Sequence, residues 1–214
     1  MRFAVPALTV AALAASLVSA PASAAPITLE PSASTVVVGE RGRGVWNTFT
    51  ARGAGASVQG MDLELVAPDG EKVLVDFVWR AGPGVWNGAA SFNRFDAPGK
   101  WRGTLVVRDK AGKEKRAARV VFHVKRRTTL SAALPDGRGG SVSGVLRRLG
   151  ETGGFRPYAG QKVRLYKWTG GAWKLVATAT TGAKGKYAFS ARPGKLQVRY
   201  SGTAVNAPVT RTAP

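Results

Sequence analysis

The sequence has no cysteine among its 214 residues and a single histidine, His123. Without cysteine the chain cannot use disulfides, a thiol nucleophile or thiolate metal ligands, so a packed core has to stabilise the fold. Acidic residues are also scarce, with 12 aspartates and glutamates against 32 lysines and arginines, and the formal net charge is +20. With so few carboxyl groups, a catalytic pair of carboxylates is not favoured. A calcium site is not favoured either, because calcium takes about six to eight oxygen ligands.

Long hydrophobic runs are missing except at the N-terminus. There, an apolar run over residues 7–18 follows Arg2 and leads to the small residues Ala22-Ser23-Ala24. This pattern predicts a secretory signal peptide over residues 1–24, with cleavage before Ala25. The run is shorter than the roughly 20 residues that span a bilayer, so we expect no membrane insertion. We expect a secreted, extracellular protein that can associate with the cell envelope.

Helical periodicity is missing as well. Apolar and polar residues alternate in short runs, which glycine, proline, aspartate or asparagine interrupts about every 8 to 12 residues. In residues 73–80 the odd-numbered positions predict a buried face and the even-numbered positions an exposed one. Trp101, Leu105 and Val107 predict the buried face of a second run. The pattern predicts an all-β fold built from antiparallel sheets.

The chain divides at three consecutive cations, residues 125–127, where one alternating run ends and another begins. We predict one β-sandwich over residues 25–124, a basic linker over 125–127 and a second β-sandwich over 128–214. A Pro-Gly-Lys turn precedes a late strand in each half, at residues 98–100 and at residues 193–195. These shared turns indicate that the halves are related modules.

Charge is distributed unevenly between the halves. Residues 25–124 hold 14 lysines and arginines against 10 acids, a balance of +4, whereas residues 128–214 hold 14 against 2, a balance of +12. A surface this basic attracts polyanions in a salt-dependent way. We expect an anionic cell-wall polymer or polysaccharide as the partner and no specific nucleic acid.

Residues 140–202 carry a spaced set of small, apolar and aromatic residues. The set comprises Val142-Ser143-Gly144, Leu146, Gly160, Val163, Leu165, Trp173, Val176, Thr178, Thr181, Gly185, Tyr187, Phe189, Tyr200 and Gly202. Behind a signal peptide and a β module, it resembles the tandem Ig-like secreted proteins of actinobacteria, some of which carry a calcium-binding label. The resemblance implies two consecutive Ig-like antiparallel β-sandwich modules after the signal peptide. Such modules serve as spacers, adhesion elements and appendages of exported enzymes, so function is implied only broadly.

The residues themselves do not favour an active site or a metal site. Asp62 and Glu64 alternate with leucines, which predicts a solvated strand face, and no segment has the spacing of a calcium-binding loop. His123 lies on the opposite side of its strand from Val120, Phe122 and Val124, and no nucleophile motif accompanies it. We predict no enzyme, no metal site and no cofactor.

The richest candidate surface is a predicted hairpin. Gly170-Gly171 predicts a two-residue turn that places Trp168 opposite Trp173 and Lys167 opposite Lys174. This register predicts one outward face and one core-facing set. The outward face would hold Arg164, Tyr166, Trp168, Trp173 and Leu175. The other face would hold the core-facing set Val163, Leu165 and Val176, together with the paired lysines Lys167 and Lys174.

Aromatic rings next to cations can stack on sugars while the cations hold acidic groups. We take Arg164, Tyr166, Trp168, Trp173 and Lys174 as candidate ligand-binding residues. Paired tryptophans also stabilise hairpins without any ligand, so a purely structural role stays open. Trp79, Trp86 and Trp101 alternate with polar residues in other strands, which predicts core packing for them.

These features predict a secreted, non-catalytic, monomeric Ig-like protein. Its role would be structural or adhesive at the cell envelope, with attraction to anionic wall polymers. One alternative is a carbohydrate-binding module that uses the Trp168/Trp173 hairpin face. The other alternative is a calcium-binding secreted protein.

Overall fold

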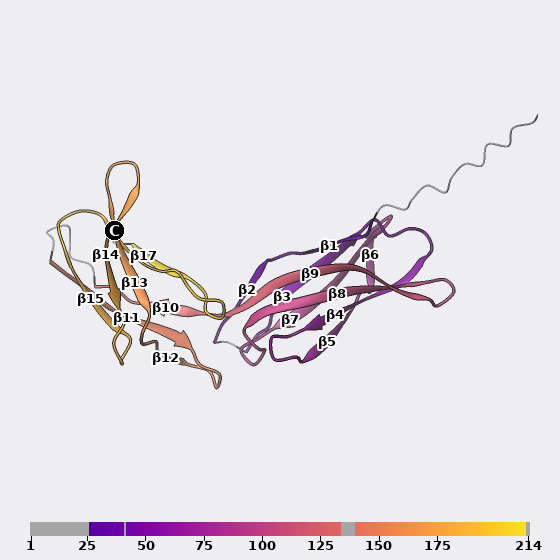
Figure 1. The fold of residues 1–214 in the computed structure, drawn as a ribbon, viewed down its shortest axis with the longest axis horizontal. Helices are drawn as coiled ribbons and strands as arrows, with labels where there is room; N and C mark the ends of the chain where they lie inside the picture. The colour runs from indigo at the N-terminus through magenta and orange to yellow at the C-terminus, as the bar shows by residue number, and fades with distance from the viewer. Residues whose placement is uncertain (1–25, 41, 134–139, 213–214) are drawn as a thin grey trace, which may run out of the picture.

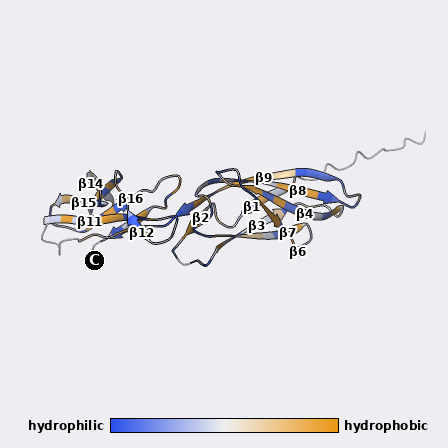
Figure 2. Cartoon of the chain, turned by 90° about the horizontal axis from the view of Figure 1, so that it is seen from below, coloured by the Kyte–Doolittle hydropathy of each residue, from blue (hydrophilic) through white to orange (hydrophobic). Residues whose placement is uncertain are grey.

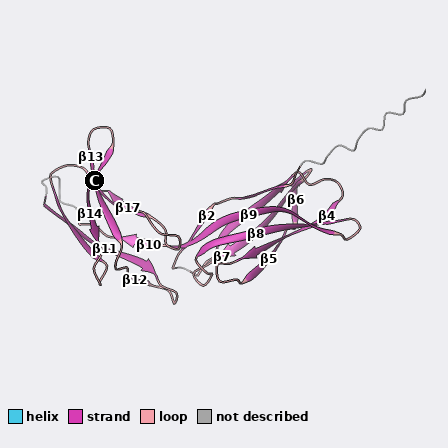
Figure 3. Ribbon diagram, in the orientation of Figure 1, coloured by secondary structure: helices cyan, strands magenta, loops and turns pink. Residues whose placement is uncertain are grey.

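The computed structural model of the protein describes residues 26–40, 42–133 and 140–212. These residues form strands and loops without a helix (Figure 3), and so contain no helix able to cross a membrane. The strands lie in two groups, arranged end to end along the longest axis of the molecule (Figure 1). The predicted all-β fold is confirmed, whereas the predicted signal peptide lies outside the described residues.

The first group of strands forms two facing sheets. One sheet has the order β1-β3-β7-β6, and the other has the order β2-β9-β8-β4-β5. Neighbouring strands are antiparallel except β2 and β9, which pair in parallel. The strands are β1 (Thr28–Pro31), β2 (Thr35–Val38), β3 (Val45–Arg52), β4 (Val58–Val66), β5 (Lys72–Asp76), β6 (Trp79–Gly82), β7 (Val85–Phe92), β8 (Gly99–Asp109) and β9 (Glu114–Arg126). This arrangement is an Ig-like sandwich.

An aromatic cluster forms the centre of the first core. The ring of Trp101 lies 5.1 Å from that of Phe92 and 6.1 Å from that of Phe122, measured between centroids. The indole Nε1 of Trp101 donates a hydrogen bond of 2.9 Å to the carbonyl oxygen of Ala97. The ring thus packs on both sheets while its polar atom is satisfied, as a buried tryptophan requires.

The predicted alternation of buried and exposed residues is confirmed in the first sandwich. Val75 and Phe77 are buried, whereas Leu74, Asp76 and Val78 are exposed. Leu105 and Val107 are buried together with Trp101. Figure 2 shows hydrophobic and hydrophilic stretches sharing the same strands, as expected when one face of each strand meets the core.

A buried amide fixes the point where the chain passes from β1 to β2, and so from one sheet to the other. Asn47 is fully buried in β3. Its Oδ1 accepts hydrogen bonds from Ser32 Oγ at 2.9 Å and from Ala33 N at 3.0 Å, and its Nδ2 donates to Ala33 O at 3.2 Å. These bonds compensate the buried polar group and anchor the crossing segment.

The second group of strands also forms a sandwich. One sheet joins β10, β11 and β12 in that order, and β15 pairs with β11 as well. The facing sheet has the order β14-β13-β16-β17. The strands are β10 (Thr128–Leu130), β11 (Gly140–Leu149), β12 (Phe155–Pro157), β13 (Lys162–Trp168), β14 (Trp173–Thr180), β15 (Lys186–Ala191), β16 (Leu196–Tyr200) and β17 (Val209–Thr212). The two consecutive Ig-like β-sandwiches that the family resemblance implies are therefore present.

Two glycines of the second sandwich allow its backbones to approach closely. A Cβ added at Gly144 would lie 1.9 Å from Ser131 O, and one added at Gly185 would lie 2.3 Å from Leu146 O. Gly185 also has a φ of 69°, which side chains other than hydrogen disfavour. Because Gly144 has no side chain, the hydroxyl of the buried Tyr187 can donate a hydrogen bond of 2.6 Å to Ser131 O.

The glycines of the two Pro-Gly-Lys turns have the same φ. Gly99 and Gly194 both have a φ of 138°. Two positions after each glycine, Trp101 in β8 and Leu196 in β16 are both almost fully buried. The matching turns place equivalent strands in the two cores.

The two sandwiches meet where β9 gives way to β10, with only Arg127 between the two strands. The Arg126 backbone donates to Val205 O and accepts from Ala207 N, each at 2.9 Å, in the loop before β17. The Thr128 hydroxyl donates to Ala207 O at 2.8 Å. The chain therefore crosses between the sandwiches as a hydrogen-bonded segment. Where one domain ends and the next begins remains a prediction.

Candidate binding face

The predicted hairpin register is confirmed. β13 and β14 pair so that Trp168 lies opposite Trp173 and Lys167 opposite Lys174. The two indole rings meet edge to face, with 5.4 Å between centroids and an interplanar angle of 63°. Gly170 in the turn has a φ of 83°, which glycine adopts without strain. The hairpin projects from the body of the second sandwich (Figure 1).

The structure places four of the five candidate residues on one face of the sheet. Arg164, Tyr166 and Trp168 alternate along β13, and Trp173 lies opposite Trp168, so all four point away from the core. Lys174 does not join them. It lies opposite Lys167, and cross-strand partners share a face, so both lysines occupy the other side of the hairpin.

Arg199 completes this face, although the sequence analysis did not single it out. It lies opposite Arg164 in the pairing of β13 with β16. Its guanidinium carbon lies 4.5 Å from the centroid of the Tyr166 ring and 6.0 Å from that of Trp173. A guanidinium above an aromatic ring is attracted by the ring's quadrupole. We call Arg164, Tyr166, Trp168, Trp173 and Arg199 the aromatic–arginine face.

Hydrogen bonds hold the cations of the aromatic–arginine face in place. Arg199 Nε donates to Gln197 Oε1, and Gln197 Nε2 donates to Thr212 Oγ1 at 2.7 Å. Arg164 Nη1 donates to Ser201 Oγ at 2.6 Å. Neither arginine is paired with a carboxylate among the described residues. The face therefore presents two positioned guanidinium groups whose charge no carboxylate of the described residues neutralises.

The predicted core position of Val176 is wrong. The register shifts between Leu165 and Tyr166, since Tyr166 pairs with Leu175 and Leu165 pairs with Ala177. Val176 is the extra residue of this β-bulge and is half exposed. Ala177 takes its place against the core that Val163 and Leu165 form. The predicted exposure of Leu175 is confirmed.

The remaining tryptophans differ in exposure. Trp86 and Trp101 are buried, which confirms the predicted core packing for both, whereas the side chain of Trp79 lies outside the described residues. Trp46, which the sequence analysis did not discuss, is 67% exposed in β3. The alternation of β3 could have revealed it, because Asn47 and Phe49 take the inward positions.

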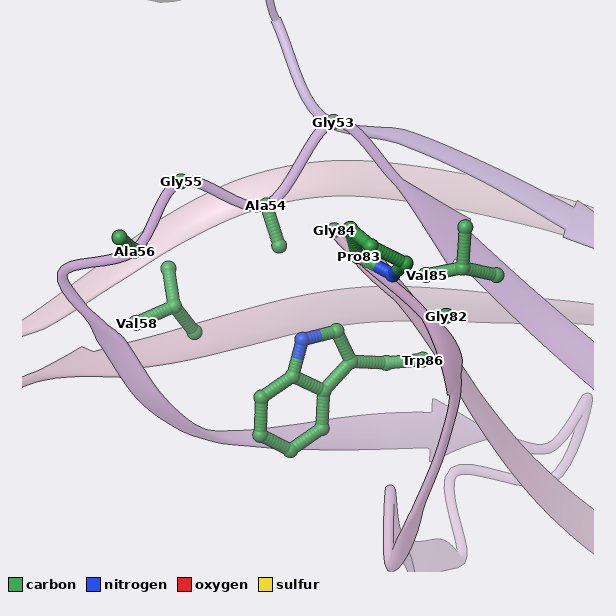
Figure 4. Close-up of a pocket in the computed structure, with 10 residues that line it drawn as sticks. All are labelled: Gly53, Ala54, Gly55, Ala56, Val58, Gly82, Pro83, Gly84, Val85 and Trp86. Carbon is green, nitrogen blue, oxygen red and sulfur yellow. The ribbon is translucent and has the colours of Figure 1, made fainter.

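A hollow beside Trp86 lies in the first sandwich. Its indole lies below the loops of residues 53–56 and 82–85, as the close-up shows (Figure 4). Glycine, alanine, valine and proline make up the other lining residues, and none of them carries a charge. Without an ionisable or nucleophilic side chain, this hollow offers no chemistry for catalysis.

Two acidic residues of the first sandwich, Asp62 and Glu64, form ion pairs with cations. Glu64 pairs with Lys72 at 2.7 Å, and Asp62 pairs with Arg108 at 3.3 Å. The hydrogen bond from Lys72 lowers the pKa of the Glu64 carboxyl. No group of three or more histidine, cysteine, aspartate or glutamate side chains that could hold a metal ion occurs within the described ranges. The solvated strand face predicted for Asp62 and Glu64 is confirmed, since both side chains are partly exposed.

No protein-family model and no curated protein sequence match the chain. Among solved structures, two fibronectin type III domains of chicken tenascin share 15% identity, over 86% of this chain and 96% of that chain, with a TM-score of 0.43. The fibronectin(III)-like modules of Clostridium thermocellum CbhA share 11% identity, over 87% and 92%, with a TM-score of 0.35.

A tetra-tandem repeat from the extending region of a large adhesion protein is also similar. It shares 14% identity over 87% of this chain, with a TM-score of 0.29, and the chain spans 47% of its length. Identities and scores this low carry no statement about what this chain binds.

Proposed function

We propose that the protein is an exported, non-catalytic structural or adhesive protein of the cell envelope. In this proposal residues 1–24 direct export, residues 25–124 form a sandwich that acts as a spacer, and residues 128–214 form the sandwich that holds anionic wall polymers. The basic residues 125–127 connect them. The observation that carries the proposal is the aromatic–arginine face, which combines partly exposed rings with two guanidinium groups that form no ion pair with a carboxylate in the described part of the chain.

The chemistry of this face suits an acidic polysaccharide or another wall polymer. A sugar ring can stack on the 38% exposed indole of Trp168. Arg164 and Arg199 can meet carboxylate or phosphate oxygens through paired N–H donors. The balance of +12 over residues 128–214 adds a longer-range attraction, which salt weakens.

A second candidate function is a carbohydrate-binding module that recognises neutral sugars through Trp168 and Trp173 alone. The edge-to-face pair of an exposed Trp168 and a partly exposed Trp173 favours it. Binding of a neutral glycan would persist at high salt, whereas electrostatic binding would fade. The calcium alternative gains no support from the described residues, because the acidic pairs Asp62–Arg108 and Glu64–Lys72 already compensate those carboxylates.

Cell fractionation tests the proposed location. The protein is expressed in an actinobacterium with a C-terminal tag, and washed cells are compared with clarified medium. We expect a large fraction on washed cells at low salt and its release by a high-salt wash. Protein found entirely in the medium at low salt would overturn the proposal. Retention that a high-salt wash does not reduce would instead favour the carbohydrate-binding candidate.

A further inference from the structure

A pocket where the two sandwiches meet brings together arginines from three strands. Arg126 comes from the end of β9, Arg148 from β11 and Arg156 from β12. The pocket has a volume of about 320 Å³, and Glu151 is the one carboxylate among its lining residues. Three guanidinium groups against one carboxylate leave an excess of two positive charges in a small space.

Arg148 and Arg156 lie directly opposite each other in the pairing of β11 with β12. Both residues are exposed, so solvent screens part of the repulsion between their like charges, and an anion bound between them would remove the rest. Neutral groups orient both side chains. Arg148 stacks on the ring of Tyr158 with 4.8 Å to the centroid, and Arg156 Nη2 donates to Thr152 Oγ1 at 2.9 Å. Within the described ranges, neither arginine forms an ion pair with a carboxylate.

The buried guanidinium of Arg126 has too few hydrogen-bond and charge partners to offset its desolvation. Its side chain is 15% exposed, and its Nε is buried without a hydrogen-bond partner. Its Nη1 lies 3.2 Å from Oε1 of Glu151, a side chain that is 81% exposed. A mostly solvated carboxylate screens a buried guanidinium poorly, and a buried donor without a partner is costly. The pocket therefore lacks negative charge at its buried side.

We propose that this pocket binds a phosphate group. The planar forks of the arginines match phosphate oxygens, and a phosphate dianion balances the excess of two charges. A carboxylate carries one charge, and Glu151 already supplies one. The pocket belongs to strands other than those of the aromatic–arginine face, so the inference does not depend on the proposed function. Bound phosphate would link Arg126, at the end of β9, to Arg148 and Arg156 of the second sandwich.

Isothermal titration calorimetry of the mature protein tests the site. Inorganic phosphate is the probe, and sodium chloride holds the ionic strength constant. We expect saturable binding of phosphate and much weaker binding of acetate. Arg148→Gln/Arg156→Gln should weaken phosphate binding about tenfold or more. Lys184→Gln/Lys195→Gln removes the same charge from two exposed lysines outside the pocket and should leave the affinity unchanged.

Two further variants separate the role of the guanidinium geometry and of Glu151 from a loss of charge or of folding. Arg148→Lys/Arg156→Lys retains charge and chain length but loses the forks, so it should fold and still bind phosphate more weakly. Glu151→Gln removes the competing carboxylate and should tighten binding several-fold. The proposal is overturned by absent phosphate binding, by equal loss in the lysine control pair, by acetate binding as tightly as phosphate, or by weakened binding in Glu151→Gln.

Discussion

The guanidinium of Arg199 lies over the ring of Tyr166, with 4.5 Å between the guanidinium carbon and the ring centroid. The two residues come from neighbouring strands, β16 and β13, and are 33 positions apart in the chain. Their stacking joins the cations of the face to its aromatic rings. A ligand that meets one kind of group therefore meets the other.

Substitution of Arg199 separates its charge from its stacking. Arg199→Lys keeps the charge but loses the planar group over Tyr166, so we expect wall-polymer affinity to fall by about three- to tenfold. Lys184→Gln, which removes a charge elsewhere on the same sandwich, should have a smaller effect. Binding isotherms with solubilised wall polymer at fixed salt measure both variants. Equal affinity of wild type and Arg199→Lys would show that stacking contributes nothing.

Trp101 should be essential to the stability of the first sandwich. Trp101→Ala removes a ring packed between Phe92 and Phe122, and we expect a loss of about 3–5 kcal/mol in the free energy of unfolding. Trp46→Ala truncates an exposed indole and should change that free energy by less than about 0.5 kcal/mol. Urea denaturation followed by circular dichroism compares the two variants. Similar losses for both would contradict the assigned core.

Gly144 is required because β11 approaches Ser131 closely. Gly144→Ala would place its Cβ 1.9 Å from Ser131 O and 2.5 Å from the Tyr187 hydroxyl, so we expect a loss of at least about 2 kcal/mol. Gly171→Ala is the control, because nothing lies within 4 Å of a Cβ there. Hydrogen exchange should localise the loss to β10, β11 and β15. Gly144→Ala with unchanged protection in these strands would refute the close approach.

The fold class and the hairpin register could be predicted from the sequence because both depend on local rules. Alternation sets which residues are buried, and Gly170-Gly171 sets which residues face each other. The bulge at Val176 was missed, since nothing local in the sequence marks an extra residue. Arg199 was missed because it joins the face through the pairing of β16 with β13, a contact between distant segments.

The arginine pocket was hidden for the same reason. Arg126 and Arg148 are adjacent to other cations in the sequence, so each appears as part of a dispersed basic surface. They converge only when the end of β9 meets the β11–β12 pair. The charge balance of the sequence predicts that a partner carries negative charge. Only the tertiary structure shows where several cations line one pocket.

Alkaline pH should destabilise the second sandwich. Burial raises the pKa of Tyr187 to about 12 from an ordinary value of 10.0. The folded state therefore favours the neutral phenol, and its contribution to stability is complete below pH about 10 and is lost as the pH rises towards about 12. Burial raises the pKa of Tyr200 as well.

Alkaline titration with circular dichroism and tyrosinate absorbance checks this pH dependence. We expect buried tyrosines to ionise together with unfolding. In Tyr187→Phe, which cannot ionise at this position, the alkaline unfolding midpoint should move to higher pH even though the hydrogen bond to Ser131 is lost. Ionisation of every tyrosine near its ordinary pKa, with no change in circular dichroism, would contradict the burial of Tyr187.

Sedimentation of the mature protein with isolated cell wall across a salt series tests the central claim most directly. Wild type is compared with Trp168→Ala/Trp173→Ala and with Trp46→Ala, which removes an exposed indole from the other sandwich. We expect strong binding at low salt for all three proteins, and at intermediate salt a clear loss for the double variant alone. Identical salt curves for the three proteins would contradict a role for the aromatic–arginine face.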